Sequence, residues 1–269
     1  MNAVRFRDLL AAEWLKTWSL RSTPWAYLLT ALAVIGFNAG EAYDTYHYWN
    51  EGEGGSSARQ FVRDGLPVQN AFTGNASLVF ALATVAMGVV AVSGEYSTGQ
   101  IRTTFTAVPA RRPVLAAKLA VTAASMTVFG AVVALVSFYV TQAFLGLRNV
   151  GVPLDHPGAL RAVCASALLA PVCALVGMGI GAVLRHAGTS MVAGVVLLLL
   201  GPLLFSEDHH WSALFNHTFP MSAWDRLTQI PFTSDTPFPW TTAGAWIVYA
   251  AWALGAAVVA GAVVQRRDQ

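Results

Sequence analysis

Charged side chains are scarce in this chain of 269 residues. Aspartate, glutamate, lysine and arginine make up 11% of it, whereas soluble domains contain about 25% charged residues. Hydrophobic residues make up 55%, and they come in long blocks separated by short polar segments. About 20 consecutive apolar residues cross a bilayer as a helix. The composition therefore excludes a soluble globular domain and predicts a membrane protein with several spans.

Cysteine is almost absent. The two cysteines, Cys164 and Cys173, lie in one apolar run, and on a helix they would be about 13 Å apart along the axis. A disulfide needs Cα atoms closer than about 7 Å. We therefore expect neither a disulfide nor a cysteine metal site, and we interpret both residues as small apolar side chains within the membrane.

The motifs of catalytic and nucleotide-binding domains are also missing. The sequence contains no GxxxxGK followed by Ser or Thr, no HExxH and no GxSxG, so it has no phosphate loop, zinc-protease helix or nucleophile elbow. No histidine lies in the middle of an apolar run, which argues against a haem held across a bundle. We interpret Asp208, His209 and His210 as solvated loop residues rather than a metal site. We expect no catalytic residue, metal or cofactor in this chain.

Ionisable groups are rare within the apolar runs as well. Carriers driven by protons or ions usually keep such groups inside the membrane. Here Lys118 stands near one end of its run, and Arg161 and Arg185 bracket another. This pattern argues against a self-powered carrier and leaves a transport subunit whose energy comes from another chain.

Six apolar runs are present, and their unbroken character favours helices over alternating barrel strands. We expect one all-α, polytopic transmembrane domain over residues 1–269, with a third span longer than a bilayer needs. Pro171 and Pro202 are expected to kink or break the fourth and fifth spans. The expected spans are residues 25–40, 75–93, 114–144, 161–184, 188–206 and 241–264.

The basic residues set the orientation. With the N-terminus inside, inner segments hold eleven of the 16 lysines and arginines, and cytoplasmic segments carry such an excess. Both termini are therefore predicted to be cytoplasmic. Segments 41–74 and 206–240 then lie outside, and the second is expected to include a short helix or re-entrant element whose aromatic residues pack at the outer interface. Those aromatic residues are Trp211, Phe215, Phe219, Trp224 and Phe232.

Residues 4–20, VRFRDLLAAEWLKTWSL, precede the first span. Phe6, Leu10, Trp14 and Trp18 recur at every fourth position, whereas Lys16 belongs to the opposite, more polar face. This pattern is typical of an amphipathic helix that lies in the membrane interface. A cytosolic helix packed on protein is the alternative.

Residues 94–113, GEYSTGQIRTTFTAVPARRP, lie between the second and third spans. Ser97 and Gln100 have the spacing of a capping box, which predicts a short helix over residues 98–107 that ends before Pro109. Its apolar face and basic flank suit docking on a protein, although a helix lying on lipid headgroups is also consistent. Glu95, the only carboxylate between Asp64 and Asp155, suits a charge-paired hinge with an arginine as its mate. The residues expected in this contact are Glu95, Ile101, Arg102, Phe105, Val108 and Arg111.

The same stretch resembles the region after the second span in type-2 permeases of ATP-binding-cassette exporters, especially actinobacterial ones. In those permeases a Gly-Glu pair is followed by a small-residue turn, a short helix, a proline, basic residues and a lysine in the next span. FPMSAW at 219–224 also resembles a proline-containing turn of that family. The residues that match the first pattern are Gly94, Glu95, Gly99, Arg102, Pro109, Arg111, Arg112 and Lys118.

The resemblance implies a bacterial plasma-membrane subunit that works with a separate P-loop ATPase, which binds ATP and Mg. It also implies a second permease copy, identical or different, and a coupling helix after the second span. The apolar spans suit an amphipathic or lipophilic cargo such as a drug, antibiotic, peptide or lipid. Membrane lipid is the expected surrounding, and no nucleic-acid partner is expected. The expected pathway residues, on spans two and five, are Ser77, Phe80, Thr84, Met87, Met191 and Leu198.

Two alternatives to an exporter subunit remain at this point. A membrane-embedded enzyme acting on lipid would need convergent polar groups at the outer interface and activity without ATP. A non-transporting sensor or scaffold would use the same ATPase without moving a cargo.

Overall fold

The computed structural model describes residues 5–49, 54–108, 110–205, 209–229 and 238–267. Within these ranges the chain forms helices and no strands, so the all-α prediction is confirmed. The helices and their bounds are α1 (Phe6–Ser19), α2 (Ser22–His47), α3 (Gly54–Arg63), α4 (Leu66–Ala71), α5 (Gly74–Ser97), α6 (Gln100–Ala107), α7 (Arg111–Gly146), α8 (Ala159–Leu184), α9 (Ala187–Val195), a π-helical turn (Val196–Leu200), α10 (Gly201–Leu204), α11 (His210–Asn216), α12 (Pro220–Thr228) and α13 (Thr242–Arg267).

Five helical segments in the described residues are long and apolar enough to cross a membrane. They correspond to five of the six expected spans. The expected first span falls on α2, which has 26 residues but is less apolar and is not among the five, so the count of six stays a prediction. The five segments are Leu66–Ser97, Arg111–Gly146, Ala159–Leu184, Ala187–Leu204 and Thr242–Val263.

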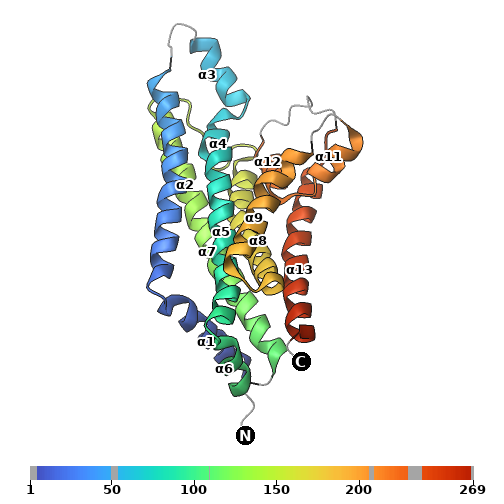
Figure 1. Cartoon of the computed structure of the whole chain (residues 1–269). Coiled ribbons are helices and arrows are strands. Elements are labelled where there is room, and N and C mark those ends of the chain that lie inside the picture. Colours follow the sequence, from blue (N-terminus) through green and yellow to red (C-terminus); the bar gives the residue numbers. More distant parts are fainter. Residues whose placement is uncertain (1–4, 50–53, 109, 206–208, 230–237, 268–269) are drawn as a thin grey trace.

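The two ends of the bundle carry different elements (Figure 1). Both ends of the chain, α1 and α6 lie at one end, which we call the α6 end. The helices α3, α11 and α12 lie at the other, which we call the distal end. Helix α2 runs the length of the bundle between the two. Helix α7 has 36 residues, about 54 Å of helix, and its first turns extend to the α6 end.

Helix α8 forms the centre of the bundle. It packs against α5, α7, α12 and α13. In its most apolar stretch, 72% of the residues are buried inside the bundle. Glycines bring the neighbouring backbones close: a Cβ added at Gly88 of α5 would collide with the Ala174 carbonyl of α8, and one at Gly130 of α7 would collide with the Ala167 carbonyl. Small residues are the usual means by which membrane helices approach closely.

The two prolines behave differently. Helix α8 continues from Ala159 to Leu184 with Pro171 inside it, so the helix is not broken there, and the other expected outcome, a kink, stays a prediction. Pro171 is buried, and the helices packed around α8 hold it in place. The fifth span is interrupted as expected, because a π-helical turn over Val196–Leu200 precedes Gly201 and Pro202, and Pro202 begins a new helical turn. Turns of this kind are rare in proteins, and those that do occur are often found at functional sites.

The distal segment 206–240 contains α11 and α12, which confirms the expected short helical element. Its aromatic residues are only partly packed: Trp224 is buried and donates from its indole N–H to Ser166 Oγ at 3.1 Å, whereas Trp211 and Phe215 are exposed. Phe219 is half-buried, and Phe232 lies outside the described residues. Burial is therefore confirmed for Trp224, which contacts α8, but not for Trp211 and Phe215.

Candidate functional site

Helix α1 lies across the start of α7. Leu9 of α1 packs with Val114 and Ala117 of α7 in a small apolar cluster, and Glu13 is buried on the same face. The tryptophans keep part of their rings exposed: Trp14 is 49% exposed, and Trp18 is 39% exposed and lies with its ring centre 5.3 Å from that of Tyr27. An exposed aromatic face suits contact with a membrane surface, so the arrangement agrees with an interfacial helix, whose placement in the membrane stays a prediction.

The turn from α5 into α6 differs from the predicted capping box. Helix α5 continues through Ser97, whose hydroxyl donates back to the Gly94 carbonyl at 3.0 Å. Helix α6 starts at Gln100 after Gly99, which adopts a φ of +73°, a conformation that favours glycine. The predicted cap at Ser97 is therefore wrong, because the glycine allows a tight left-handed turn in which α5 ends only three residues before α6 begins.

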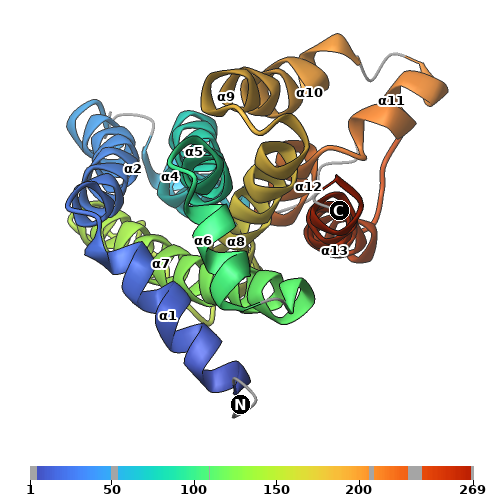
Figure 2. The same ribbon diagram turned by 60° about the horizontal axis from the view of Figure 1, so that its bottom comes forward.

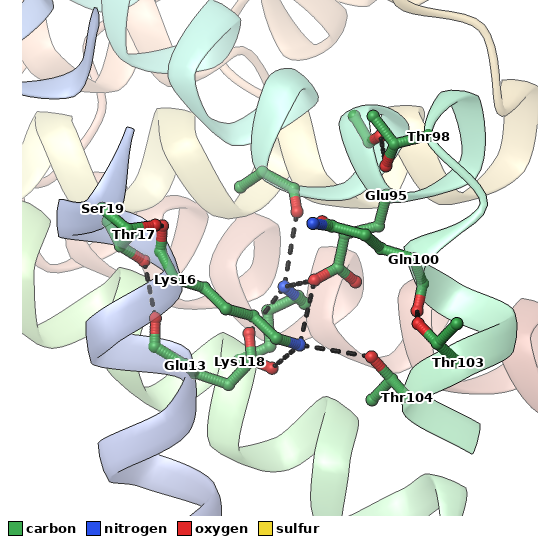
Figure 3. Close-up of polar contacts among 12 residues, drawn as sticks. Glu13, Lys16, Thr17, Ser19, Glu95, Thr98, Gln100, Thr103, Thr104 and Lys118 are labelled. Carbon is green, nitrogen blue, oxygen red and sulfur yellow. Dashed lines mark hydrogen bonds and ion pairs between the residues drawn. The ribbon is translucent and has the colours of Figure 1, made fainter. Parts of the chain in front are cut away.

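Four charged side chains meet where α1, α5 and α7 come together (Figure 3). Glu95, in the last turns of α5, accepts from Lys118 Nζ at 2.9 Å and from Lys16 Nζ at 3.2 Å. Glu13 accepts from the same two lysines, at 2.6 Å from Lys118 and 2.7 Å from Lys16. We call Glu13, Lys16, Glu95 and Lys118 the charge cluster. Each lysine bridges both carboxylates, so the cluster joins three helices with no net charge.

Most of the charge cluster is shielded from solvent. The side chains of Glu13, Lys118 and Glu95 are 5%, 12% and 13% exposed, and only Lys16 reaches 35%. Burial alone would raise the pKa of Glu13, but the attraction and hydrogen bonds of Lys118 and Lys16 outweigh it and hold this pKa below its usual value. Burial alone would lower the pKa of the Lys16 amine, but the contacts with Glu13 and Glu95 outweigh this effect and raise the pKa above its usual value.

These directions fix how the charge cluster responds to pH. A lowered carboxylate pKa contributes stability that is lost only when the pH falls through it, and a raised lysine pKa contributes stability that is lost only when the pH rises through it. Glu13 therefore loses its contribution in acid and Lys16 in strong alkali. Both residues stay charged throughout the neutral range.

Two further contacts connect the charge cluster to neighbouring helices. Lys16 Nζ also donates to Thr104 Oγ1 of α6 at 3.4 Å (Figure 3), and Val108, which follows α6, packs against the Leu9 cluster. On the other side of α5, the Arg185 guanidinium at the end of α8 lies 4.7 Å from the centre of the Tyr96 ring. The end of α5 is thus held to α1, α6, α7 and α8.

The partners of Glu95 correct the sequence interpretation. An arginine, Arg102 or one on a partner, was expected as its mate, but the structure pairs it with Lys118 and Lys16. Lys16 was placed on the solvent face of α1, and Glu13 was missed. A usable signal existed: Glu95 and Lys118 are isolated charges at neighbouring span ends, and such charges usually pair.

The other predicted contact residues lie around α6. Ile101 and Arg111 are half-buried, as is Val108. The side chains of Arg102 and Phe105 lie outside the described residues, so their docking role stays a prediction.

The predicted pathway residues lie mostly within the core of one chain. Ser77, Phe80 and Thr84 of α5 are buried, and the Thr84 hydroxyl donates to the Phe80 carbonyl of its own helix at 2.8 Å. Leu198 is also buried, Met87 is half-buried and Met191 is 37% exposed. The close approach of α5 to α8 explains why the small and polar residues of α5 point inward.

The cluster Asp208, His209 and His210 is described only in part. Asp208 lies outside the described residues, whereas His209 and His210 are exposed and His210 packs against the ring of Phe238. Among the described residues, no group of three histidine, cysteine or acidic side chains is placed to hold a metal ion.

Comparison with known proteins bears on this arrangement. The sequence model of a family described as "ABC-2 family transporter protein" matches residues 21–263. The match covers the apolar bundle together with Glu95, α6 and Lys118, whereas α1 precedes it. No curated protein matches the chain.

Proposed function

Because the chain belongs to the ABC-2 family of transporter proteins, we propose that it is the membrane subunit of an ATP-driven exporter in a bacterial plasma membrane. The family is one of membrane permeases and implies association with an ATPase of the ATP-binding-cassette type. The chain itself lacks the phosphate-loop motif, so ATP and Mg would be bound by that partner, and this chain would be a non-catalytic transport subunit.

The observation that carries this proposal is the position of the charge cluster directly beside α6. Glu95 lies five residues before Gln100, the first residue of α6. Displacement of α6 by an ATPase would act through the short Gly99 turn on the end of α5, and through Lys16 on α1. Since packed helices tend to shift between discrete arrangements, a movement of α6 would be passed to α5 and α7 together.

We further propose six crossings, with α2 as the first. Five of the crossings are the apolar segments described above. Both chain ends lie at the α6 end in Figure 1, and a chain that returns to its starting side must cross an even number of times. An orientation with the α6 end in the cytoplasm agrees with the excess of lysine and arginine there.

Single-cysteine labelling tests this topology. In a background with Cys164 and Cys173 replaced by alanine, we expect cysteines at Ser57 and Ser212 to react with a membrane-impermeant maleimide in intact cells. A cysteine at Thr103 of α6 should react only after the membrane is permeabilised. Labelling of Thr103 in sealed cells would contradict the orientation and the docking of an ATPase on α6.

The contact with the ATPase is tested by Phe105→Ala. Removing a buried aromatic side chain from an interface is expected to cost about 1.5–3 kcal/mol, which is a roughly ten- to hundredfold loss of affinity. The measurement is the amount of its ATPase retained by the tagged chain after purification at several ATPase concentrations. Thr103→Ala is the matched control, because this hydroxyl is exposed and donates only within α6. Equal retention by both variants would contradict docking through Phe105.

A second permease copy would complete the transport pathway. Helix α5 lies between α2 and α9 along one side of the bundle (Figure 2), and this side leaves Asn75 and Val90 of α5 exposed, as well as Met191 of α9. In the proposed dimer this side faces the other copy. The exposed residues on it are mostly apolar, which suits an amphipathic or lipophilic cargo. The six predicted pathway residues stay predictions, and the buried ones among them would line a pathway only if α5 moves relative to α8.

A further inference from the structure

A cavity of about 520 Å³ lies at the distal end, remote from the charge cluster. Its walls come from α10, α11 and α12, from Gly74 at the start of α5 and from Trp240 before α13. Cavities of this size hold small organic ligands. The cavity lies at the end of the membrane segment Ala187–Leu204, which places it at the level where the headgroups of the surrounding bilayer would lie.

The walls of this distal cavity are fixed by hydrogen bonds. Asn216 of α11 donates from Nδ2 to the carbonyls of Pro202 and Phe205, at 3.2 and 2.7 Å, and its amide oxygen accepts from Ser222 of α12 at 2.6 Å. The His217 ring stacks on Trp240 with 4.4 Å between ring centres. The cavity is therefore a built feature that joins α10, α11 and α12.

One wall of the distal cavity is cationic. Arg226 lines it and is 8% exposed, and its Nε donates to the Trp240 carbonyl at 2.7 Å. Burial lowers the pKa of Arg226, and the nearby charge of Arg161 lowers it further. Arg161 donates to the Leu227 and Gln229 carbonyls, at 2.9 and 2.7 Å, which fixes it beside the end of α12. The positive charge of Arg161 thus adds to that of Arg226 at this end of α12, and two such charges attract an anion.

The other sides of the cavity differ in character. Pro202 and Leu203 of α10 line it, as does Phe205, which follows α10. Leu203 is 74% exposed, so α10 forms an apolar wall that continues onto the lipid-facing surface. Asp225 also lines the cavity but is exposed, and it accepts from Gln229 Nε2 at 2.8 Å. A buried cation beside an apolar wall fits a ligand with an anionic head and an apolar tail.

We propose that the distal cavity binds an anionic amphiphile with a phosphate headgroup, the phosphate directed to Arg226 and the apolar part along α10. Arginine suits this role because its planar fork matches phosphate oxygens. The proposal does not rest on an ATPase partner, since binding is measurable on the purified chain alone, so its failure would leave the exporter proposal untouched.

Native mass spectrometry of the purified full-length chain, titrated with phosphatidylglycerol, tests the site. We expect Arg226→Gln to weaken binding about tenfold or more, the usual scale for losing a hydrogen bond to a charged group. Gly74→Leu should weaken it similarly without changing charge, because a Cβ at Gly74 meets no atom within 4 Å and the longer side chain would occupy the cavity. Asp225→Asn should leave binding equal or tighter, since it removes a negative charge from the rim.

The controls separate this site from general lipid adhesion. Arg148→Gln makes the same charge change away from the distal cavity, at a residue that donates to the Tyr46 carbonyl, and should leave binding unchanged. Phosphatidylcholine with the same acyl chains should bind at least tenfold more weakly, and inorganic phosphate should not displace the lipid at equal concentration. Unchanged binding in both Arg226→Gln and Gly74→Leu would overturn the proposal. So would an equal loss in Arg148→Gln, weaker binding in Asp225→Asn, or displacement by inorganic phosphate, which would remove the role of the apolar wall.

Discussion

Replacing Glu95 with glutamine is expected to leave the chain inserted in the membrane but to lower transport-linked ATP hydrolysis of the assembled complex about tenfold or more. Insertion depends on the apolar spans, which the substitution does not change. The loss follows because Glu95 holds both Lys118 and Lys16, and its glutamine replacement leaves the charge cluster with one surplus positive charge. The measurement is substrate-stimulated ATPase activity of the reconstituted complex, together with transport per ATP hydrolysed.

The size of this effect depends on burial. An exposed ion pair contributes under about 1 kcal/mol, whereas breaking a buried one costs about 3–5 kcal/mol. The side chains of Glu95 and Lys118 are only 13% and 12% exposed, so the second figure applies better. We therefore also expect the thermal midpoint of the chain to fall.

A double substitution separates the two roles of this pair. Lys118→Gln alone should lower the thermal midpoint as Glu95→Gln does, because each leaves an unbalanced charge. Combining the two restores neutrality and leaves the pair Glu13–Lys16, 2.7 Å apart. We expect the double variant to recover most of the thermal stability but not the coupling of hydrolysis to transport. If coupling recovers as well, the ion contact does not transmit movement and only the unbalanced charge was harmful.

Gly88→Leu is expected to prevent the bundle from reaching its native packing. Even a single carbon at Gly88 would overlap the Ala174 carbonyl. This carbonyl belongs to the backbone of α8, so it cannot move aside by a side-chain rotation. Overpacking of this kind costs about 1–3 kcal/mol, occasionally more, and leucine adds three further carbons. Fluorescence-detected size-exclusion chromatography should show loss of the monodisperse peak, and Gly88→Ala should show a partial loss with a lowered thermal midpoint.

Gly40 supplies the control for this prediction. It lies on α2, and a Cβ there would meet no atom within 4 Å. Gly40→Ala should therefore be neutral or stabilising, because alanine favours a helix over glycine by about 0.8–1 kcal/mol. If Gly40→Ala and Gly88→Ala lower the thermal midpoint equally, the close contact of α5 and α8 is not what the glycine protects.

Much of the architecture could be predicted from sequence because apolar runs have a definite length. The fourth span was expected at 161–184 and the structure has Ala159–Leu184. Helix boundaries were harder wherever the turn chemistry was ambiguous. Ser97 fits a capping box by spacing, yet Gly99 permits the tighter turn that the chain adopts. Helix α2 extends to His47, past the expected end at residue 40, since the helix continues into polar sequence beyond the apolar run.

The candidate site could be predicted only in part. Glu95 stood out by its isolation and is one member of the charge cluster. Its partners could not be assigned, because contacts between residues such as Lys16 and Glu95 depend on how α1 crosses α7, and no local pattern encodes that crossing. The inward direction of Ser77 and Thr84 also depends on tertiary packing, here the close contact of α5 with α8.

The charge cluster also sets an order for biosynthesis. Its members are synthesised at two different times. Glu13 and Lys16 leave the ribosome first, and Glu95 and Lys118 follow about a hundred residues later. At usual rates of synthesis this delay is roughly 5–20 seconds. Until then α1 has neither the α7 surface under Leu9 nor the second pair of charges. Helix α1 is therefore among the later helices to reach its final contacts, and it docks only after α7 has begun to emerge.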